Sequence, residues 1–112
     1  MTESAVKYDR DADGIVTLTL DDPNQSANTM NELYKTSMAE AVEKLYAEAD
    51  DVTGVVIASA KKTFFAGGDL KNMIQVRPEN AAQVFEEVES IKAALRKLET
   101  FPKPVVAAIN GA

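Results

Sequence analysis

The residues best suited to do chemistry lie in a glycine turn, residues 62–70, with the sequence KTFFAGGDL. An apolar run stops at Gly67 and Gly68, and Asp69 follows immediately. Glycine lets the backbone approach a ligand closely and adopt a positive φ. A turn of this kind can leave a backbone N–H free to bind an oxygen that carries negative charge. We expect the Gly68 N–H to be that donor.

Simpler interpretations of the turn stay open beside this one. The glycine pair also fits a tight connection from a strand to a helix, without a ligand. Asp69 stands where a helix N-cap belongs, so its carboxylate is expected to cap the next helix, with a catalytic carboxylate as the alternative. Three flanking lysines either bind phosphate as point charges or lie in solvent: Lys61, Lys62 and Lys71.

Composition narrows the chemistry further. The 112 residues contain no His and no Cys, which excludes a thiolate nucleophile, a Ser-His triad and the commonest metal ligands. We therefore predict no metal site. The net charge of −6 argues against a nucleic-acid surface. No apolar run approaches the roughly 20 residues of a membrane span, and the start at Met1 is polar, so we predict a cytoplasmic protein.

The first half of the chain must position this turn. Residues 6–10 and 15–20 are predicted to form a strand hairpin, joined through the Asp-Gly pair at residues 13–14. Residues 21–28 read as a loop. Thr29 and Glu32 have the spacing of a capping box, which predicts a helix reaching about residue 49. Its apolar positions recur at helical spacing: Leu33, Met38, Ala41, Val42 and Leu45.

The second half alternates strands and helices. We predict a buried strand over residues 54–60, a short helix over 70–76 and a longer helix that starts near Pro78 and ends before Pro102. Residues 105–109 are predicted to form another buried strand. The apolar face expected for the long helix has seven members: Ala81, Val84, Phe85, Val88, Ile91, Leu95 and Leu98.

The predicted order ββαβααβ indicates the α/β class. The apolar strand over residues 105–109 is followed only by a turn, whereas the next element of an α/β unit normally covers such a strand. We therefore expect residues 1–112 to be an incomplete fragment of a longer domain.

Three segments together resemble one family. They are the turn FFAGGDL at residues 64–70, KPVVAAINGA at 103–112, and the loop PNQSANT at 23–29. Their order and spacing resemble those of the enoyl-CoA hydratase/isomerase (crotonase) superfamily over essentially the whole chain. The resemblance implies the N-terminal portion of the α/β, crotonase-like (ClpP/crotonase) fold of ββα units. Asn28-Thr29 is similar to the multifunctional α subunit of fatty-acid oxidation complexes.

The resemblance also implies a reaction: addition of water to a trans-2-enoyl-CoA in fatty-acid β-oxidation. The thioester carbonyl would lie between two backbone N–H donors, the first of which maps onto Gly68. Coenzyme A, as part of the substrate, would contact five further positions: Ser26, Ala27, Ala66, Asp69 and Leu70. No permanently bound cofactor is implied. Met73, one helical turn after the glycines, is a candidate for lining an acyl pocket.

Other implied parts do not map onto this chain. The second N–H donor belongs to a glycine-rich segment beyond Ala112, and the two catalytic glutamates lie further on. Many members have Arg before the loop proline, where this chain has Asp22, so no positive charge meets a phosphate there. Enoyl-CoA isomerisation and a non-catalytic acyl-CoA-binding or assembly module remain alternatives. The implied partners are further copies of the chain and a thiolase β subunit.

Overall fold

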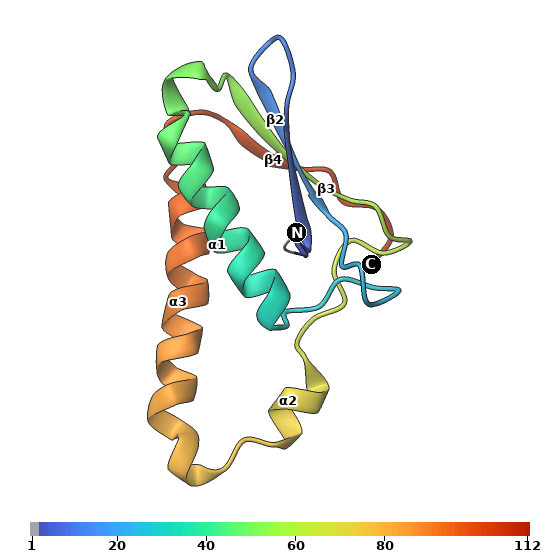
Figure 1. Cartoon of the computed structure of the whole chain (residues 1–112), viewed down its shortest axis with the longest axis vertical. Coiled ribbons are helices and arrows are strands. Elements are labelled where there is room, and N and C mark those ends of the chain that lie inside the picture. The colour runs from blue at the N-terminus through green and yellow to red at the C-terminus, as the bar shows by residue number, and fades with distance from the viewer. Residues whose placement is uncertain (1–2) are drawn as a thin grey trace.

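The computed structural model describes residues 3–112, which form one mixed sheet with helices packed beside it (Figure 1). The strands are β1 (Val6–Arg10), β2 (Ile15–Leu20), β3 (Gly54–Ser59) and β4 (Val105–Ala107). The helices are α1 (Glu32–Ala47), α2 (Leu70–Ile74) and α3 (Ala81–Glu99), with short 3-10 turns at Ala49–Asp51 and Pro78–Asn80. The predicted α/β class and the order of elements are confirmed.

The sheet has the strand order β1-β2-β3-β4. β1 and β2 pair antiparallel as the predicted hairpin, and Gly14 in its turn has φ +82°. A Cβ on Gly14 would also lie 2.7 Å from the Asp51 carbonyl oxygen, so the turn requires glycine for both reasons. β3 runs parallel to β2, and β4 runs parallel to β3. Parallel pairing brings the segments that follow β2 and β3 to the same edge of the sheet.

The core lies between the hairpin and α1. Val16 and Leu18 of β2 are completely buried, in keeping with the alternating pattern of that strand. From α1, four of the five predicted apolar positions are buried: Met38, Ala41, Val42 and Leu45. Leu33 packs against this cluster only in part. Burial of one stripe of α1 against the sheet is what fixes the helix, and therefore the loop that leads into it.

The predicted cap of α1 is wrong. Asn31, not Thr29, is the N-cap of α1, and its side-chain oxygen accepts a hydrogen bond from the Tyr34 N–H at 2.9 Å. The Thr29 hydroxyl donates instead to Gln25 Oε1. Asn31 is favoured over Thr29 as the N-cap because its Nδ2 also donates to Asp22 Oδ2 at 2.7 Å. One side chain therefore caps the helix and anchors the loop.

Asp69 does occupy the N-cap position of α2, but its side chain makes no capping hydrogen bond. The backbone just before it pairs with the segment entering α1 through the bridge between Met30 and Gly68. The Asp69 carbonyl accepts from the Met73 N–H at 3.0 Å. Tertiary pairing of the backbone therefore positions this five-residue helix without help from the carboxylate.

The second half of the chain is more exposed than the sequence predicts. β4 ends at Ala107 rather than 109, and Val106 is 59% exposed. In α3, Leu98 is the one buried member of the predicted apolar face, while Phe85 is 65% exposed. The described residues place one neighbouring strand beside β4 and only α1 along α3, which leaves these apolar side chains uncovered. Within residues 3–112, no helix is both long and apolar enough to cross a membrane.

This uncovered apolar surface predicts self-association. Ile74 (81% exposed) and Phe85 project hydrocarbon into solvent, and large exposed apolar patches promote contacts between molecules. We expect the 112-residue chain to form concentration-dependent oligomers in light scattering, and Ile74→Asn with Phe85→Ser to reduce them. Glu89→Gln, an exposed position in α3 like Phe85, is the control, and we expect it to leave the oligomers unchanged. A sharp monomer mass at high concentration would contradict the prediction.

Candidate functional site

The two loops singled out by the sequence lie against each other. The Ala66 N–H donates to the Asn28 carbonyl at 2.7 Å, and the Met30 N–H donates to the Gly67 carbonyl at 2.9 Å. Met30 and Gly68 form an isolated parallel bridge. The loop over 23–29 and the glycine turn are therefore one structural unit at the edge of the sheet where β2 and β3 end.

Gly68 lies in this unit with a free backbone donor. Within residues 3–112, its N–H donates to no backbone or side-chain acceptor, and the residue is solvent-exposed. Gly68 lines a cavity of about 640 Å³ whose other walls come from the start of α1, from α2 and from α3. Asp69 and Met73 also line it. The Gly68 N–H therefore has no acceptor among the described residues, and its role as a donor to a ligand stays a prediction.

The two glycines of the turn have different tasks. Gly67 adopts φ +88°, which L-residues with a side chain rarely adopt, and nothing lies within 4 Å of a Cβ built there. Gly68 has no positive φ, but a Cβ on it would lie 3.0 Å from the Met73 sulfur. Gly67 thus supplies the positive φ of the turn, whereas the absence of a Cβ at Gly68 leaves room for the Met73 side chain.

The remaining predicted coenzyme A contacts are positioned less closely around the cavity. Asp69 is half-buried in its wall, whereas Ser26 and Ala66 are exposed, Ala27 is half-buried and Leu70 is 71% exposed. These four residues lie outside the cavity lining. Ser26, Ala27 and Ala66 belong to the two loops and Leu70 begins α2, so their contacts with coenzyme A stay predictions.

Asn28 holds the two loops together, a role that the sequence analysis missed. It is 3% exposed, and its side-chain oxygen accepts from the Asp22 N–H at 3.1 Å. Its Nδ2 contacts three acceptors at 2.9–3.2 Å, on β2, on β3 and in the glycine turn: the Leu20 carbonyl, Ser59 Oγ and the Phe64 carbonyl. A buried amide is suited to this position because it donates and accepts at once.

Asp22, which stands in place of the arginine frequent in the family, is buried rather than facing a ligand. Its carboxylate accepts from the Asn24 N–H at 2.9 Å and from Asn31 Nδ2 at 2.7 Å, and the residue is 2% exposed. The carboxylate is thus a loop anchor. Its hydrogen bonds link the loop to the N-cap of α1.

Lys61 follows neither of its two expected roles. Its Nζ lies 2.9 Å from Asp21 Oδ1 and donates to the Asp22 carbonyl at 2.7 Å, with the side chain 16% exposed. It therefore ties the end of β3 to the end of β2. Lys62 and Lys71 are exposed beside the turn, where the two alternatives of phosphate contact and solvation stay open.

Residues 110–112, at the end of the motif over 103–112, form hydrogen bonds with the glycine turn and the residue before it. Asn110 Nδ2 donates to the Lys61 carbonyl at 2.8 Å, and the Phe64 N–H donates to the Ala112 carbonyl at 2.7 Å. Gly111 has φ +65°, and a Cβ there would lie 2.8 Å from the Lys62 carbonyl oxygen. The three sequence motifs therefore converge in space, with the turn over 62–68 between the other two.

The ion pairs of Asp21 predict a pH dependence of stability. Hydrogen bonds from Lys7 and then Lys61 lower the pKa of this carboxyl below its usual value. A lowered folded-state pKa contributes stability that is present above the unfolded value and lost as the pH falls through the folded one. We expect wild-type stability to fall below about pH 4 more than that of Asp21→Asn in urea unfolding. The effect is about 1 kcal/mol or less, since Lys7 is largely exposed. The same change in the free energy of unfolding with pH for wild type and Asp21→Asn would contradict the prediction.

Comparisons with known proteins show which family this chain resembles over most of its length. The model of the enoyl-CoA hydratase/isomerase family matches residues 10–112. The fatty acid oxidation complex subunit alpha of Psychrobacter arcticus is 34% identical over 100 residues, which are 89% of this chain and 14% of that protein. The chain thus spans about one seventh of the length of this curated relative.

Two solved structures share the fold. The enoyl-CoA hydratase of Mycobacterium smegmatis has a TM-score of 0.74 and 33% identity, covering 96% of this chain and 40% of its own. The enoyl-CoA hydratase of Bacillus anthracis has a TM-score of 0.80 and 28% identity, and the match covers 96% of this chain and 40% of that one. The crotonase-like fold expected from the sequence is confirmed, and the chain belongs to the enoyl-CoA hydratase/isomerase family.

Proposed function

We propose that this chain supplies the first oxyanion donor and part of the coenzyme A surface of an enoyl-CoA hydratase acting in fatty-acid β-oxidation. The observation that carries the proposal is the Gly68 N–H, which has no acceptor among residues 3–112 and belongs to a residue that lines a cavity of about 640 Å³. A backbone donor fixed at a turn needs no reorganisation when charge develops near it, which is how oxyanion holes lower barriers.

The chemistry follows from where charge appears. Water oxygen bonds to C3 of a trans-2-enoyl thioester, the C2–C3 π pair shifts toward the carbonyl, and the thioester oxygen becomes negative. The Gly68 N–H would donate to that oxygen, and C2 then takes up a proton while the attacking water gives one up. General acid–base groups must move these two protons. They are not assigned to residues of this chain.

Support for the physiological setting comes from the relatives. The name of the Psychrobacter arcticus relative places it in a fatty acid oxidation complex as an alpha subunit. By analogy we propose a multifunctional parent protein, located in the cytoplasm, that assembles with further copies of itself and with a thiolase β subunit. The 112-residue chain would then be a binding and positioning part of the hydratase domain.

A binding experiment on the chain tests the donor directly. We expect crotonyl-CoA to shift the Gly68 amide resonance in a ¹⁵N-labelled sample. The matched thioether analogue, which lacks the carbonyl oxygen but keeps coenzyme A, should bind without that shift. Equal shifts with both ligands, or none with either, would refute the assignment of Gly68.

An activity experiment tests the reaction. We expect no hydration of crotonyl-CoA by the 112-residue chain and turnover by its native open reading frame. Measurable turnover by the chain would show that its own carboxylates complete the site. The family description covers isomerases as well. Conversion of a 3-enoyl to a 2-enoyl thioester without uptake of water would favour isomerisation, and binding without turnover would favour an acyl-CoA-binding module.

A further inference from the structure

Met73 places its sulfur beside Gly68. The residue lies in α2, is 59% exposed and lines the same cavity as Gly68. A Cβ built on Gly68 would lie 3.0 Å from the Met73 sulfur and 4.0 Å from its Cε. Outside residues 67–69, no other heavy atom of the described residues comes within 4 Å of that position. An accessible thioether therefore lies against the residue whose N–H has no acceptor.

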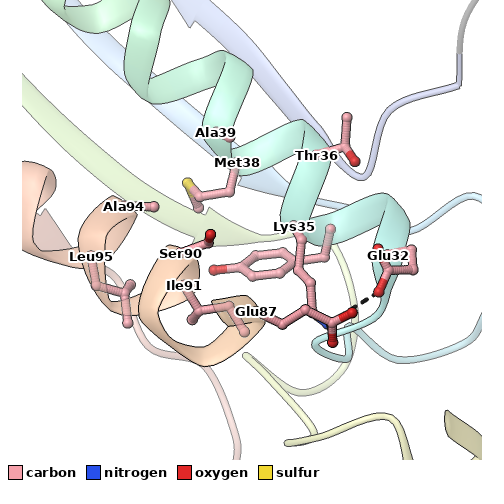
Figure 2. Close-up of a pocket in the computed structure, with 11 residues that line it drawn as sticks. Glu32, Lys35, Thr36, Met38, Ala39, Glu87, Ser90, Ile91, Ala94 and Leu95 are labelled. Carbon is pink, nitrogen blue, oxygen red and sulfur yellow. Dashed lines mark hydrogen bonds and ion pairs between the residues drawn. The ribbon is translucent and has the colours of Figure 1, made fainter. Parts of the chain in front are cut away.

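The other described methionines are less accessible. Met38 is 4% exposed and extends from α1 into the space between α1 and α3 (Figure 2). Met30 is half-buried and packs against the core. A peroxide must contact a sulfur in order to oxidise it, so exposure sets the order in which these residues react. We expect Met73 to react first.

Oxidation would change what this sulfur offers to Gly68. A sulfur lone pair attacks one oxygen of hydrogen peroxide, the O–O bond breaks, and an S=O bond forms while water leaves. Sulfur is oxidised, peroxide is reduced, and the product is methionine sulfoxide. A thioether sulfur is only a weak hydrogen-bond acceptor, whereas the sulfoxide is polar and carries an acceptor oxygen. Oxidation thus puts a strong acceptor next to a free donor.

We propose that Met73 is a peroxide-sensitive modification site, and that its sulfoxide oxygen accepts a hydrogen bond from the Gly68 N–H and so blocks this donor. The effect on catalysis rests on the proposed function, whereas the hydrogen bond itself does not. Methionine has three rotatable side-chain bonds, so the sulfoxide can turn toward the amide while the backbone stays in place. Methionine sulfoxide reductases reverse the oxidation, which makes the block reversible.

The blocked form must open before a thioester carbonyl can reach Gly68. A typical intramolecular hydrogen bond favours the bonded form by about two- to tenfold. Apparent affinity falls in proportion to the fraction of molecules that remain open. Oxidation should therefore raise the Kd of crotonyl-CoA about three- to tenfold. In the native open reading frame KM should rise while kcat stays unchanged, because bound substrate regains an intact donor.

The experiment treats the 112-residue chain with dilute hydrogen peroxide, removes the peroxide, and follows each methionine by peptide mass spectrometry. Met73 should gain one oxygen before Met30 and Met38. In a ¹⁵N-labelled sample, the Gly68 amide proton should then move downfield without any ligand. The affinity for crotonyl-CoA, measured by calorimetry, should fall by the factor given above.

Two variants isolate the sulfoxide. Met73→Leu keeps the volume of the side chain but has no sulfur, so its Gly68 resonance and its own affinity for crotonyl-CoA should be the same before and after peroxide. Met73→Gln places an amide oxygen where the sulfoxide oxygen would lie, and it should show the downfield Gly68 resonance without peroxide. Circular dichroism before and after treatment excludes unfolding as the cause of a shift.

The outcomes separate this inference from the proposed function. Oxidation of Met73 without a change at the Gly68 amide, or an equal change in Met73→Leu, would overturn the inference even while crotonyl-CoA binds to the untreated chain. Earlier oxidation of Met30 or Met38 would overturn it as well, and so would a shifted Gly68 resonance with unchanged affinity. If oxidation shifts Gly68 but crotonyl-CoA binds neither form, the proposed function fails and the modification site stands.

Discussion

Replacing Gly68 with proline in the native open reading frame is expected to lower kcat for crotonyl-CoA hydration by about 10²–10³. Proline removes the Gly68 N–H, which has no acceptor among residues 3–112 and belongs to a residue that lines the cavity. A donor that acts on developing charge strengthens in the transition state, so kcat and kcat/KM should fall together while thioester affinity changes little. In energy, the loss corresponds to roughly 2.7–4 kcal/mol of transition-state stabilisation.

Two matched variants separate the lost donor from disturbed backbone. Gly68→Ala keeps the N–H, and its Cβ would meet only the flexible end of Met73, so we expect less than about a tenfold loss. Gly67→Ala keeps the Gly68 amide but forces alanine to φ +88°, which should cost stability of about 1–2 kcal/mol. Equal rate losses in Gly68→Ala and Gly68→Pro would show that shape, not hydrogen bonding, is what Gly68 provides.

Local patterns were sufficient to predict the elements that position the site. Alternation in residues 15–20 predicts β2, and the Asp-Gly pair predicts the hairpin turn at Gly14. The start of α1 is different, because two competing caps lie two residues apart. Thr29 has the better sequence pattern, but Asn31 also reaches Asp22, and a sequence does not show which side chain has a second partner.

The helix α3 and the strand β4 are present, but the burial predicted for their apolar residues is wrong for a related reason. Apolar spacing shows which face of a helix prefers burial, but not whether an element is present to cover it. Phe85 and Val106 keep their apolar character and remain exposed, because residues 3–112 place nothing over them. Their exposure depends on which elements lie next to α3 and β4. The apolar spacing within α3 and β4 does not contain that information.

The residues of the site also differ in how far a local motif indicates their roles. The Gly68 assignment rests on the glycine pair together with the family resemblance, because the pair alone also fits a tight connection from a strand to a helix, and its role as a donor stays a prediction. The roles of Asn28 and Lys61 could not be predicted, because they depend on partners that are distant in sequence. Ser59 lies 31 residues from Asn28, and Asp22 lies 39 residues from Lys61. The available signal was an amide-rich loop in a family motif, which marks a ligand contact and a buried anchor equally well.

Asn28 should therefore be a major determinant of stability. Asn28→Ala removes the one partner that the structure gives to the Asp22 N–H and to the Phe64 carbonyl. Leu20 and Ser59 keep other partners, since the Ala60 N–H still donates to the Leu20 carbonyl and the Ser59 hydroxyl still donates to Thr63. Two orphaned polar groups cost about 3 kcal/mol in total. Urea unfolding should show the loss as a lower midpoint with an unchanged slope.

Asn24→Ala is the appropriate control in the same loop. Its side chain donates only to the exposed Glu3 carboxylate, and its backbone N–H still donates to Asp22 after the substitution. We expect a change within about 0.5 kcal/mol. If Asn28→Ala were equally mild, water would have to replace the lost partners, and the loop would not depend on this amide. If it is severe, the glycine turn loses its attachment to the loop, and the affinity for crotonyl-CoA should fall together with stability.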